Sequence, residues 1–250
     1  MSDTEIKLSI EGQVATACFA TEGGLNVLSS GLLDCVAEMV SKVRAAKGVR
    51  VLVLSAVGKV FIAGANIKEL ARLDVAGAAG FSQKGNQVFD ALAELPCVTI
   101  ARLQGAALGG GFEIALACDF RVALATAKVG LPEVSLGLIP GWKGIGRMRA
   151  LAGPAATKRL VFSAAALDAS EACDLGLIDV VADDEVGLDA AVAELIKEVS
   201  RGAPNAVAMA KQALRTGDEV KAFADCFAHA DSTEGMTAFI EKRKARWMEA

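Results

Sequence analysis

The sequence predicts an α/β fold with a largely parallel sheet, followed by a helical C-terminal portion. Three short apolar runs, at 49–56, 97–103 and 119–125, are typical of strands that are buried on both faces. They alternate with stretches of helical periodicity, and this alternation favours a parallel sheet covered by helices. Beyond Gly141 the strand signals nearly vanish, so we expect helices to dominate there.

The composition allows one large domain, or one domain with an appendage, in a chain of 250 residues. Hydrophobic residues make up 53% and the mean hydropathy is +0.42, so a large core is available. Tyrosine is absent and aromatic residues are only 5%, so aliphatic side chains must fill that core. The net charge is −4, and the dispersed Lys and Arg residues lack the clustered basic patch that nucleic-acid binding needs. An anionic small molecule held by a few cations is not excluded.

The N-terminal part contains signals for a hairpin and a helix. Residues 5–10 and 13–20 alternate in polarity around Gly12, which predicts two paired strands. Residues 29–46 follow a helical period, and Ser29 is a candidate N-cap.

The same signals place the later elements. A helix is expected at 77–94, and Pro96 separates it from the strand at 97–103. After Gly141 one strand is expected, at 177–182. The helices predicted for the C-terminal part share a 3.6-residue period and lie at 154–163, 168–174, 185–200, 204–214 and 218–229.

Cysteine and histidine usage argues against a disulfide framework and against a zinc site. The six cysteines form no CxxC pair and lie in apolar or amphipathic surroundings, so we expect reduced core residues. His229 is the only histidine. The N-terminus shows no signal or transit character, and no window has the apolar length of a membrane span. The simplest expectation is a soluble, cytoplasmic protein that binds neither membranes nor nucleic acid.

Three consecutive glycines, Gly109 to Gly111, follow a strand and a turn and precede a helical run at 112–117. Glycine lets the backbone approach a ligand closely, and a helix N-terminus offers free N–H groups and positive dipole. Such a segment can bind an oxygen that develops negative charge. It matches neither the G-x-G-x-x-G fingerprint nor a P-loop. A tight packing turn would explain the glycines equally well.

Two glutamates lie in apolar surroundings beside these glycine-rich turns. Glu113 falls on the first turn of the helical run, and Glu133 follows Pro132 in a stretch too interrupted to form a helix. A carboxyl group in a partly dry setting has a perturbed pKa and can transfer protons. Glu113 could instead be a solvated or capping residue, and Glu133 a structural one. Two of them together indicate an acid/base pair.

Residues 63–65, Ala-Gly-Ala, lie just past the end of the strand at 49–56 and its following turn. Proteins of the α/β class build sites at such strand ends, and backbone N–H groups there could provide a second donor. The alternative is a plain strand-to-helix loop in which Asn66 caps a helix starting at Ile67.

Four segments together resemble the crotonase (enoyl-CoA hydratase/isomerase) superfamily. They are VFIAGANIKEL, LQGAALGGGFEIALACDFRVA, VGLPEVSLGLIPG and GMTAFIEKRKARW, in family order and across nearly the whole chain. The resemblance implies a ββα superhelix over residues 1–190 that holds the acyl-CoA site. It also implies a helical oligomerisation region at 191–250, which makes a homotrimer or a dimer of trimers.

The resemblance also implies roles for individual residues. Ala65 and Gly110 match the backbone N–H donors of the oxyanion hole, and Glu113 and Glu133 match the two catalytic glutamates of hydratases. Such enzymes are carbon–oxygen lyases that add water reversibly, in syn fashion, across the 2,3-double bond of a 2-enoyl-CoA through an enolate. Coenzyme A is then part of the substrate, and neither a further cofactor nor a metal is expected.

Further positions match family segments that contact the substrate. They are Ala63, Gly64, Lys68, Leu70, Gly109, Pro132, Gly141, Trp142, Phe239 and Lys242. Lys68 could contact a phosphate or the ribose, or be a solvated helix lysine. Phe239 and Lys242 match positions that often reach CoA, sometimes across a subunit boundary.

The sequence departs from the family pattern in two places. Asn66 stands where Asp is usual, which removes a charge but keeps the capping ability. Trp142 and Lys143 replace small residues after Gly141, and they either line the acyl pocket or point outward and pack the following helix. We expect an altered pocket.

Other reactions remain open within the resemblance. Isomerisation of a 3-enoyl to a 2-enoyl thioester can proceed with one glutamate, so the presence of both Glu113 and Glu133 favours hydration. Decarboxylation, dehydration and thioester hydrolysis also occur on this fold. A non-catalytic CoA-binding relative is a further alternative, against which the intact glutamates and glycines count.

Overall fold

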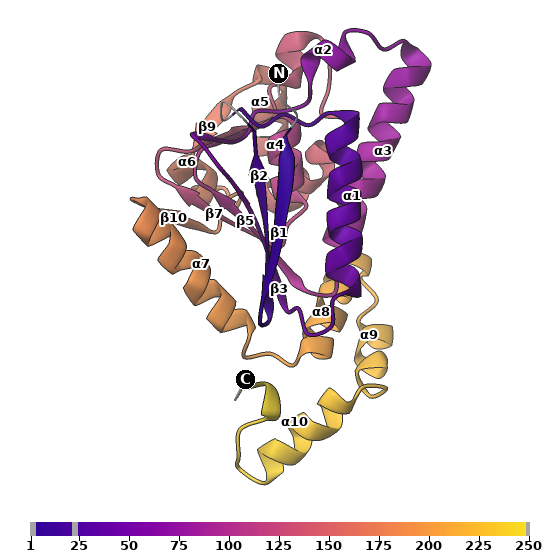
Figure 1. Ribbon diagram of the computed structural model, residues 1–250, viewed down its shortest axis with the longest axis vertical. Helices are drawn as coiled ribbons and strands as arrows, with labels where there is room; N and C mark the ends of the chain where they lie inside the picture. Colours follow the sequence, from indigo (N-terminus) through magenta and orange to yellow (C-terminus); the bar gives the residue numbers. More distant parts are fainter. Residues whose placement is uncertain (1–3, 22–24, 249–250) are drawn as a thin grey trace.

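Two β-sheets form the framework of the protein (Figure 1). The structure is a computed structural model that describes residues 4–21 and 25–248. Within these residues the larger sheet has six strands, in the spatial order β1 (Glu5–Glu11), β2 (Val14–Ala20), β3 (Val51–Ala56), β5 (Val98–Leu103), β7 (Phe120–Leu124) and β10 (Val180–Ala182). The smaller sheet has four, in the order β4 (Val60–Ile62), β6 (Ala106–Leu108), β8 (Lys128–Gly130) and β9 (Ala166–Asp168).

The predicted hairpin and the parallel sheet are both confirmed. β1 and β2 are antiparallel and meet at Gly12, whose φ of 59° suits a tight turn. The other neighbours in the larger sheet, from β2 through β10, are parallel. β3 and β5 are apolar along most of their length because both faces of the sheet are covered.

Helices cover the two faces of the larger sheet. Helices α1 (Ser30–Ala45) and α3 (Val75–Ala93) pack together on one side, and α7 (Glu185–Val199) lies on the other (Figure 1). Each face has its own apolar cluster, and the larger one extends to α4 (Gly110–Leu116). The Ser29 hydroxyl caps α1 by accepting from the backbone N–H of Leu32 at 3.1 Å, as the sequence predicts.

Each strand of the larger sheet from β3 to β7 leads directly into a strand of the smaller sheet and then into a helix. β3 leads to β4, β5 to β6, and β7 to β8. This repeated arrangement is a ββα superhelix, so the fold that the family resemblance implies is confirmed.

The remaining helices lie between α1 and α3 and in the C-terminal half. They are α2 (Ile67–Leu70), α5 (Gly144–Ser163), α6 (Ala169–Asp174), α8 (Pro204–Thr216), α9 (Glu219–Cys226) and α10 (Ala230–Ile240), with 3-10 turns η1 (Glu133–Leu136) and η2 (Arg246–Met248). α8 is tied to the core because Lys211 Nζ donates to Asp119 Oδ2 at 2.6 Å and to the Cys97 carbonyl at 2.9 Å. α9 and α10 extend beyond the α/β body (Figure 1).

The structure corrects several details of the sequence prediction. The strands of the smaller sheet have three residues each, too few to show an alternating pattern. The helix predicted at 154–163 is only the second part of α5, which Gly153 interrupts with a φ of 76°. Glu133 begins a 3-10 turn rather than a non-helical stretch, and α10 was not predicted.

The cysteines are all free thiols, as expected, but they are not all core residues. Cys97 and Cys118 are buried, three are half-buried, and Cys35 is exposed on α1. Among the described residues, no helix has both the length and the apolar composition required to cross a lipid bilayer.

Candidate active site

The candidate site lies at the carboxyl ends of three parallel strands of the smaller sheet. β4 runs into residues 63–65, β6 runs into the glycine triplet, and β8 runs into the turn that carries Glu133. Parallel strands place their carboxyl ends at the same edge, so three segments far apart in sequence converge there. The short strands that the sequence did not reveal are therefore the elements that assemble the site.

At each of the first two positions of the triplet, a different structural constraint requires glycine. Gly109 has φ 52° and ψ −127°, a backbone conformation that L side chains rarely adopt. A Cβ on Gly109 would also lie 2.9 Å from Oε1 of Glu133. A Cβ on Gly110 would lie 2.3 Å from Cζ3 of Trp142. The packing explanation of the glycines is therefore confirmed at Gly109 and Gly110, and the functional explanation stays a prediction.

Two residues at this edge, Ala65 and Gly110, have backbone N–H groups that take no part in the hydrogen bonds of the adjacent bridge and helix. Gly110 is the first residue of α4, where the N–H has no acceptor within the helix. Ala65 forms a parallel bridge with Leu28, but that bridge uses the Gly64 carbonyl and the Asn66 N–H. The Ala65 N–H therefore faces away from the bridge, and Ala65 and Gly110 line the same cavity. Together they can bind an oxygen that develops negative charge.

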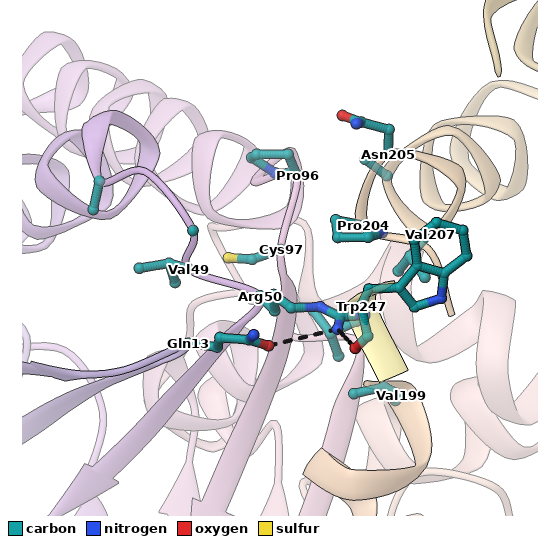
Figure 2. A pocket seen from close by; sticks show the side chains of 14 residues that line it. Gln13, Val49, Arg50, Pro96, Cys97, Val199, Pro204, Asn205, Val207 and Trp247 are labelled. Carbon is teal, nitrogen blue, oxygen red and sulfur yellow. Dashed lines mark hydrogen bonds between the residues drawn. The ribbon is translucent and has the colours of Figure 1, made fainter. Parts of the chain in front are cut away.

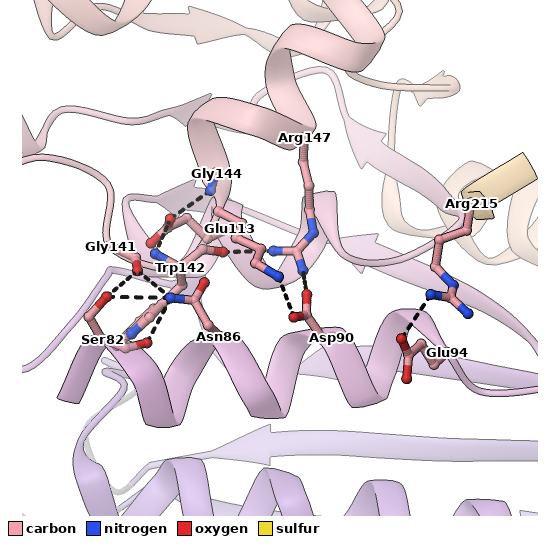
Figure 3. Close-up of polar contacts among 11 residues, drawn as sticks. Ser82, Asn86, Asp90, Glu94, Glu113, Gly141, Trp142, Gly144, Arg147 and Arg215 are labelled. Atoms are coloured by element: carbon pink, nitrogen blue, oxygen red, sulfur yellow. Dashed lines mark hydrogen bonds and ion pairs between the residues drawn. The ribbon is translucent and has the colours of Figure 1, made fainter. Parts of the chain in front are cut away.

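Glu113 is held in that cavity by the backbone of the segment before α5. Its Oε1 accepts from the N–H of Trp142 at 2.7 Å and from the N–H of Gly144 at 2.9 Å (Figure 3). Lys143, between them, has φ 64° and ψ 16°, and this left-handed conformation turns both N–H groups toward one oxygen. Successive N–H groups arranged in this way form a nest that binds anions.

Burial raises the pKa of Glu113 to about 7, because the side chain is only 1% exposed. The N–H donors of Gly144 and Trp142 oppose this rise, and the nearby charge of Glu133 adds to it. A carboxyl group with a pKa near neutrality can both take up and release a proton.

Arg147 stabilises the backbone segment that forms the nest. Its Nη1 donates to the Trp142 carbonyl at 2.7 Å, and its Nη2 pairs with Asp90 Oδ1 at 2.9 Å (Figure 3). Lys143 pairs with the other Asp90 oxygen. The backbone of Trp142 is therefore held on both sides of its Cα, because its N–H donates to Glu113 and its carbonyl accepts from Arg147.

Glu133 provides the second carboxyl group. Burial raises its pKa, while its own backbone N–H opposes the rise. Its Oε2 is buried, and no described protein group donates a hydrogen bond to it. A buried acceptor without a partner needs one, and water or substrate in the cavity could supply it.

The cavity has a volume of about 320 Å³ and brings together seven of the residues predicted for the site. They are Ala65, Leu70, Gly110, Glu113, Glu133, Gly141 and Trp142. Sequence reasoning missed Phe81 and Ser82, which reach the cavity from α3. It also missed Asp90 and Arg147, because a pairing between residues so far apart leaves no signal in one sequence.

The other predicted substrate-binding residues do not line the cavity. Ala63 and Gly64 lie just behind Ala65, and Gly109 and Pro132 are the residues before Gly110 and Glu133. Lys68 lies on α2, where the N-cap predicted for Asn66 is confirmed by its contact with the Lys68 N–H at 3.1 Å.

Phe239 and Lys242 lie at and beyond the end of α10, in the C-terminal part that extends away from the α/β body (Figure 1). Within one chain they are not brought to the cavity, because α10 lies beyond the amino-terminal edge of the larger sheet.

The two residues after Gly141 have opposite orientations. The Trp142 side chain is 2% exposed and lines the cavity, whereas the Lys143 side chain is 55% exposed and pairs with Asp90. Of the two residues that depart from the family pattern after Gly141, only Trp142 alters the lining of the cavity.

A second cavity, of about 340 Å³, lies between the amino ends of β3 and β5 and the C-terminal helices (Figure 2). Arg50 spans it and donates to the carbonyls of Gly202 and Trp247. Burial raises the pKa of the Cys97 thiol there to about 11, so this thiol is a poor nucleophile. This cavity has no carboxyl pair, and its polar contacts join the core to the C-terminal helices.

No metal site is apparent in residues 4–21 and 25–248, where no group of three or more His, Cys, Asp or Glu side chains could hold an ion. The chemistry that the described site offers is thus two N–H donors beside two carboxyl groups of raised pKa.

Comparison with known proteins identifies the family to which the chain belongs. The model of the enoyl-CoA hydratase/isomerase family matches residues 10–250. The chain is 36% identical to a short-chain-enoyl-CoA hydratase of Clostridium acetobutylicum, over 98% of this chain and 97% of that one. It is 39% identical to a mitochondrial methylglutaconyl-CoA hydratase of Mus musculus, over 90% and 76%. The crystal structure of an enoyl-CoA hydratase from Bacillus anthracis matches with a TM-score of 0.89 and 30% identity, covering 98% of this chain and 100% of that one.

Proposed function

Because the chain belongs to the enoyl-CoA hydratase/isomerase family, we propose that it is an enoyl-CoA hydratase that adds water reversibly across the 2,3-double bond of a 2-enoyl-CoA. One observation carries this proposal: two carboxyl groups and two free backbone N–H groups line one cavity. Coenzyme A enters as part of the substrate, and every catalytic group belongs to the protein.

The N–H groups of Ala65 and Gly110 bind the thioester oxygen. Addition of water at Cβ moves electrons onto this oxygen, and the enolate that forms carries its negative charge there. Fixed donors stabilise that charge without reorganisation, and loss of one such donor typically raises the barrier by about 2.7–4 kcal/mol.

The two glutamates divide the acid and base roles. The nest of N–H groups stabilises Glu113 as a carboxylate, so it takes a proton from water while the water oxygen bonds to Cβ. Glu133, whose buried Oε2 has no hydrogen-bond partner among the described protein groups, carries the proton that is delivered to Cα. The substrate gains one water in total, and transfer of the proton from Glu113 to Glu133 restores the site. Delivery from the same side of the double bond gives syn addition.

The test is hydration of crotonyl-CoA, followed by the loss of the ultraviolet absorbance of the enoyl thioester. We expect Glu113→Gln and Glu133→Gln each to lower kcat by roughly 10²–10⁴-fold, because each removes one proton-transfer group. Binding of the substrate should survive in both variants. Glu94→Gln, on the exposed end of α3, is the matched control and should retain wild-type turnover.

Two outcomes would contradict this mechanism. Full activity of Glu133→Gln would exclude the two-carboxyl reaction. Conversion of a 3-enoyl to a 2-enoyl thioester without hydration would identify an isomerase, which needs only one of the glutamates.

We also propose that the active protein is a homotrimer or a dimer of trimers assembled through α8–α10. Large apolar side chains of these helices are exposed; they are Leu214, Val220, Phe223, Phe227, Phe239 and Ile240. Large exposed apolar side chains that gather on one part of a chain are typical of a protein–protein interface. In such an assembly Phe239 and Lys242 would approach the CoA of another subunit, and Lys68 would approach the CoA of its own.

A further inference from the structure

The Trp142 indole fills the space between α3 and the start of α4. A Cβ on Gly85 of α3 would lie 2.1 Å from its Nε1, and a Cβ on Gly110 would lie 2.3 Å from its Cζ3. Both helices therefore have a glycine where they face the indole. The space that two ordinary side chains would occupy is taken by one large side chain from a third segment.

The indole is fixed in this position. Its Nε1 donates to the Phe81 carbonyl at 3.3 Å, and its ring packs on Phe81 and Phe89 with centroid distances of 5.2 and 5.3 Å. Its backbone is held by Glu113 and Arg147. A side chain held by two hydrogen-bonded peptide groups, one indole hydrogen bond and two aromatic contacts is a rigid wall.

This wall lies next to the atoms that react. In the proposed hydratase reaction the thioester oxygen accepts from the Gly110 N–H and Cβ lies between Glu113 and Glu133, and all three residues line the cavity. The indole of Trp142 lies against Gly110, and the backbone N–H of Trp142 donates to Glu113. Acyl carbons beyond Cβ that continue between α3 and α4 therefore meet the indole at once.

The lining of the cavity also restricts the charge of the acyl group. No Lys, Arg or His is among the described residues that line it, and Arg147 already binds Asp90 and the Trp142 carbonyl. A carboxylate at the far end of an acyl group would lie near Glu113 and Glu133 without a cation. An unpaired buried charge of this kind is strongly unfavourable.

We propose that Trp142 ends the acyl cavity and restricts the enzyme to short, uncharged 2-enoyl thioesters. The proposal rests on the hydratase function and specifies its substrate class. It identifies Trp142 as a specificity-determining residue.

The experiment compares kcat/KM for crotonyl-CoA, trans-2-octenoyl-CoA and glutaconyl-CoA in the wild type, Trp142→Leu and Trp142→Phe. The readout is the ratio of octenoyl to crotonyl, in which any effect common to both substrates cancels. We expect wild-type crotonyl-CoA to be preferred by roughly tenfold or more over each of the others. Trp142→Leu should raise the octenoyl-to-crotonyl ratio at least tenfold, and Trp142→Phe should raise it less.

Leu92→Ala is the matched control for loss of packing. Leu92 is fully buried on α3 and does not line the cavity, so its truncation loosens the core without opening the site. We expect the control to keep the wild-type ratio, and circular dichroism should confirm that every variant is folded.

The outcomes separate the two proposals. Equal wild-type use of crotonyl-CoA and octenoyl-CoA, or an unchanged ratio in both folded Trp142 variants, would overturn the role of Trp142 while leaving the hydratase function intact. Wild-type preference for glutaconyl-CoA would overturn the restriction on charge. Absence of hydration with all three substrates would instead refute the hydratase function.

Discussion

At the scale of a residue, the burial that suits Glu113 to its proposed catalytic role also lowers the stability of the fold. Its carboxyl group is buried, and the pKa is raised from 4.5 to about 7. The folded protein therefore binds this proton more tightly than the unfolded chain does. The contribution of the protonated Glu113 to the free energy of unfolding is fully present below about pH 4.5 and is lost as the pH rises through about 7.

Glu113→Gln removes this pH-dependent loss, because the amide oxygen can still accept from the nest but never ionises. At pH 8 we expect the variant to unfold at a higher temperature than the wild type. Its free energy of unfolding should be larger by up to about 3 kcal/mol. The advantage should shrink toward pH 4.5. Thermal unfolding at both pH values measures the difference, and a Gln variant less stable than the wild type at pH 8 would contradict it.

Single residues were the most predictable part of the site. The glycine triplet, Glu113 and Glu133 stand out in one sequence because each conflicts with its local context. Asp90 and Arg147 do not stand out, since a charged residue on an amphipathic helix is ordinary until its partner is known. The orientation of Trp142 against Lys143 depends on the left-handed backbone at Lys143, which no sequence pattern indicated.

At the scale of an element, the start of α5 positions the proposed catalytic carboxyl group of Glu113. Arg147 donates to the carbonyl of Trp142, the residue whose N–H donates to Glu113, so we regard Arg147 as a positioning residue. Arg147 also lowers the pKa of Glu113 through its charge. Its loss should loosen the nest and favour the protonated form of Glu113.

We expect Arg147→Gln to lower kcat about tenfold or more and to move the acid limb of the pH profile of kcat/KM upward from about pH 7. Arg215→Gln is the control, because Arg215 pairs with Glu94 on the same helix α3 but is about half exposed (Figure 3). It should leave the pH profile unchanged. A lower kcat in Arg147→Gln with an unshifted acid limb would point to general loosening instead.

Long elements were predictable, and short ones were not. α1, α3, β3 and β5 each contain enough residues for a period or a buried run to be recognised. β4, β6 and β8 have three residues each, and only their pairing in the structure identifies them as strands. The elements that place Ala65, Gly110 and Glu133 at one edge were thus implied by the family resemblance rather than by local pattern.

At the scale of the whole molecule, the C-terminal helices carry large apolar side chains that are exposed in the single chain. Phe223 and Phe227 of α9 contact each other with ring centroids 5.4 Å apart, and both are mostly exposed. The assignment of residues 1–190 to a core and 191–250 to oligomerisation stays a prediction.

Phe223→Glu combined with Phe227→Glu should convert the proposed oligomer to smaller species, because two charges would be buried in the proposed apolar interface. Light scattering after size-exclusion chromatography measures the mass. Val186→Glu, which changes an exposed apolar residue of α7, is the control and should keep the wild-type mass. A wild-type protein that is monomeric would refute the assembly itself.

The rigid indole has a spectroscopic consequence as well. The chain contains two tryptophans and no tyrosine, so its intrinsic fluorescence arises from one fluorophore in the catalytic cavity and one at the C-terminal helices. The fluorescence of Trp142 should change when the cavity is occupied. The Nε1 of Trp247 donates to the Arg201 carbonyl, so the fluorescence of Trp247 should change when the C-terminal segment moves. Replacement of either one by phenylalanine leaves a native optical reporter for the other event.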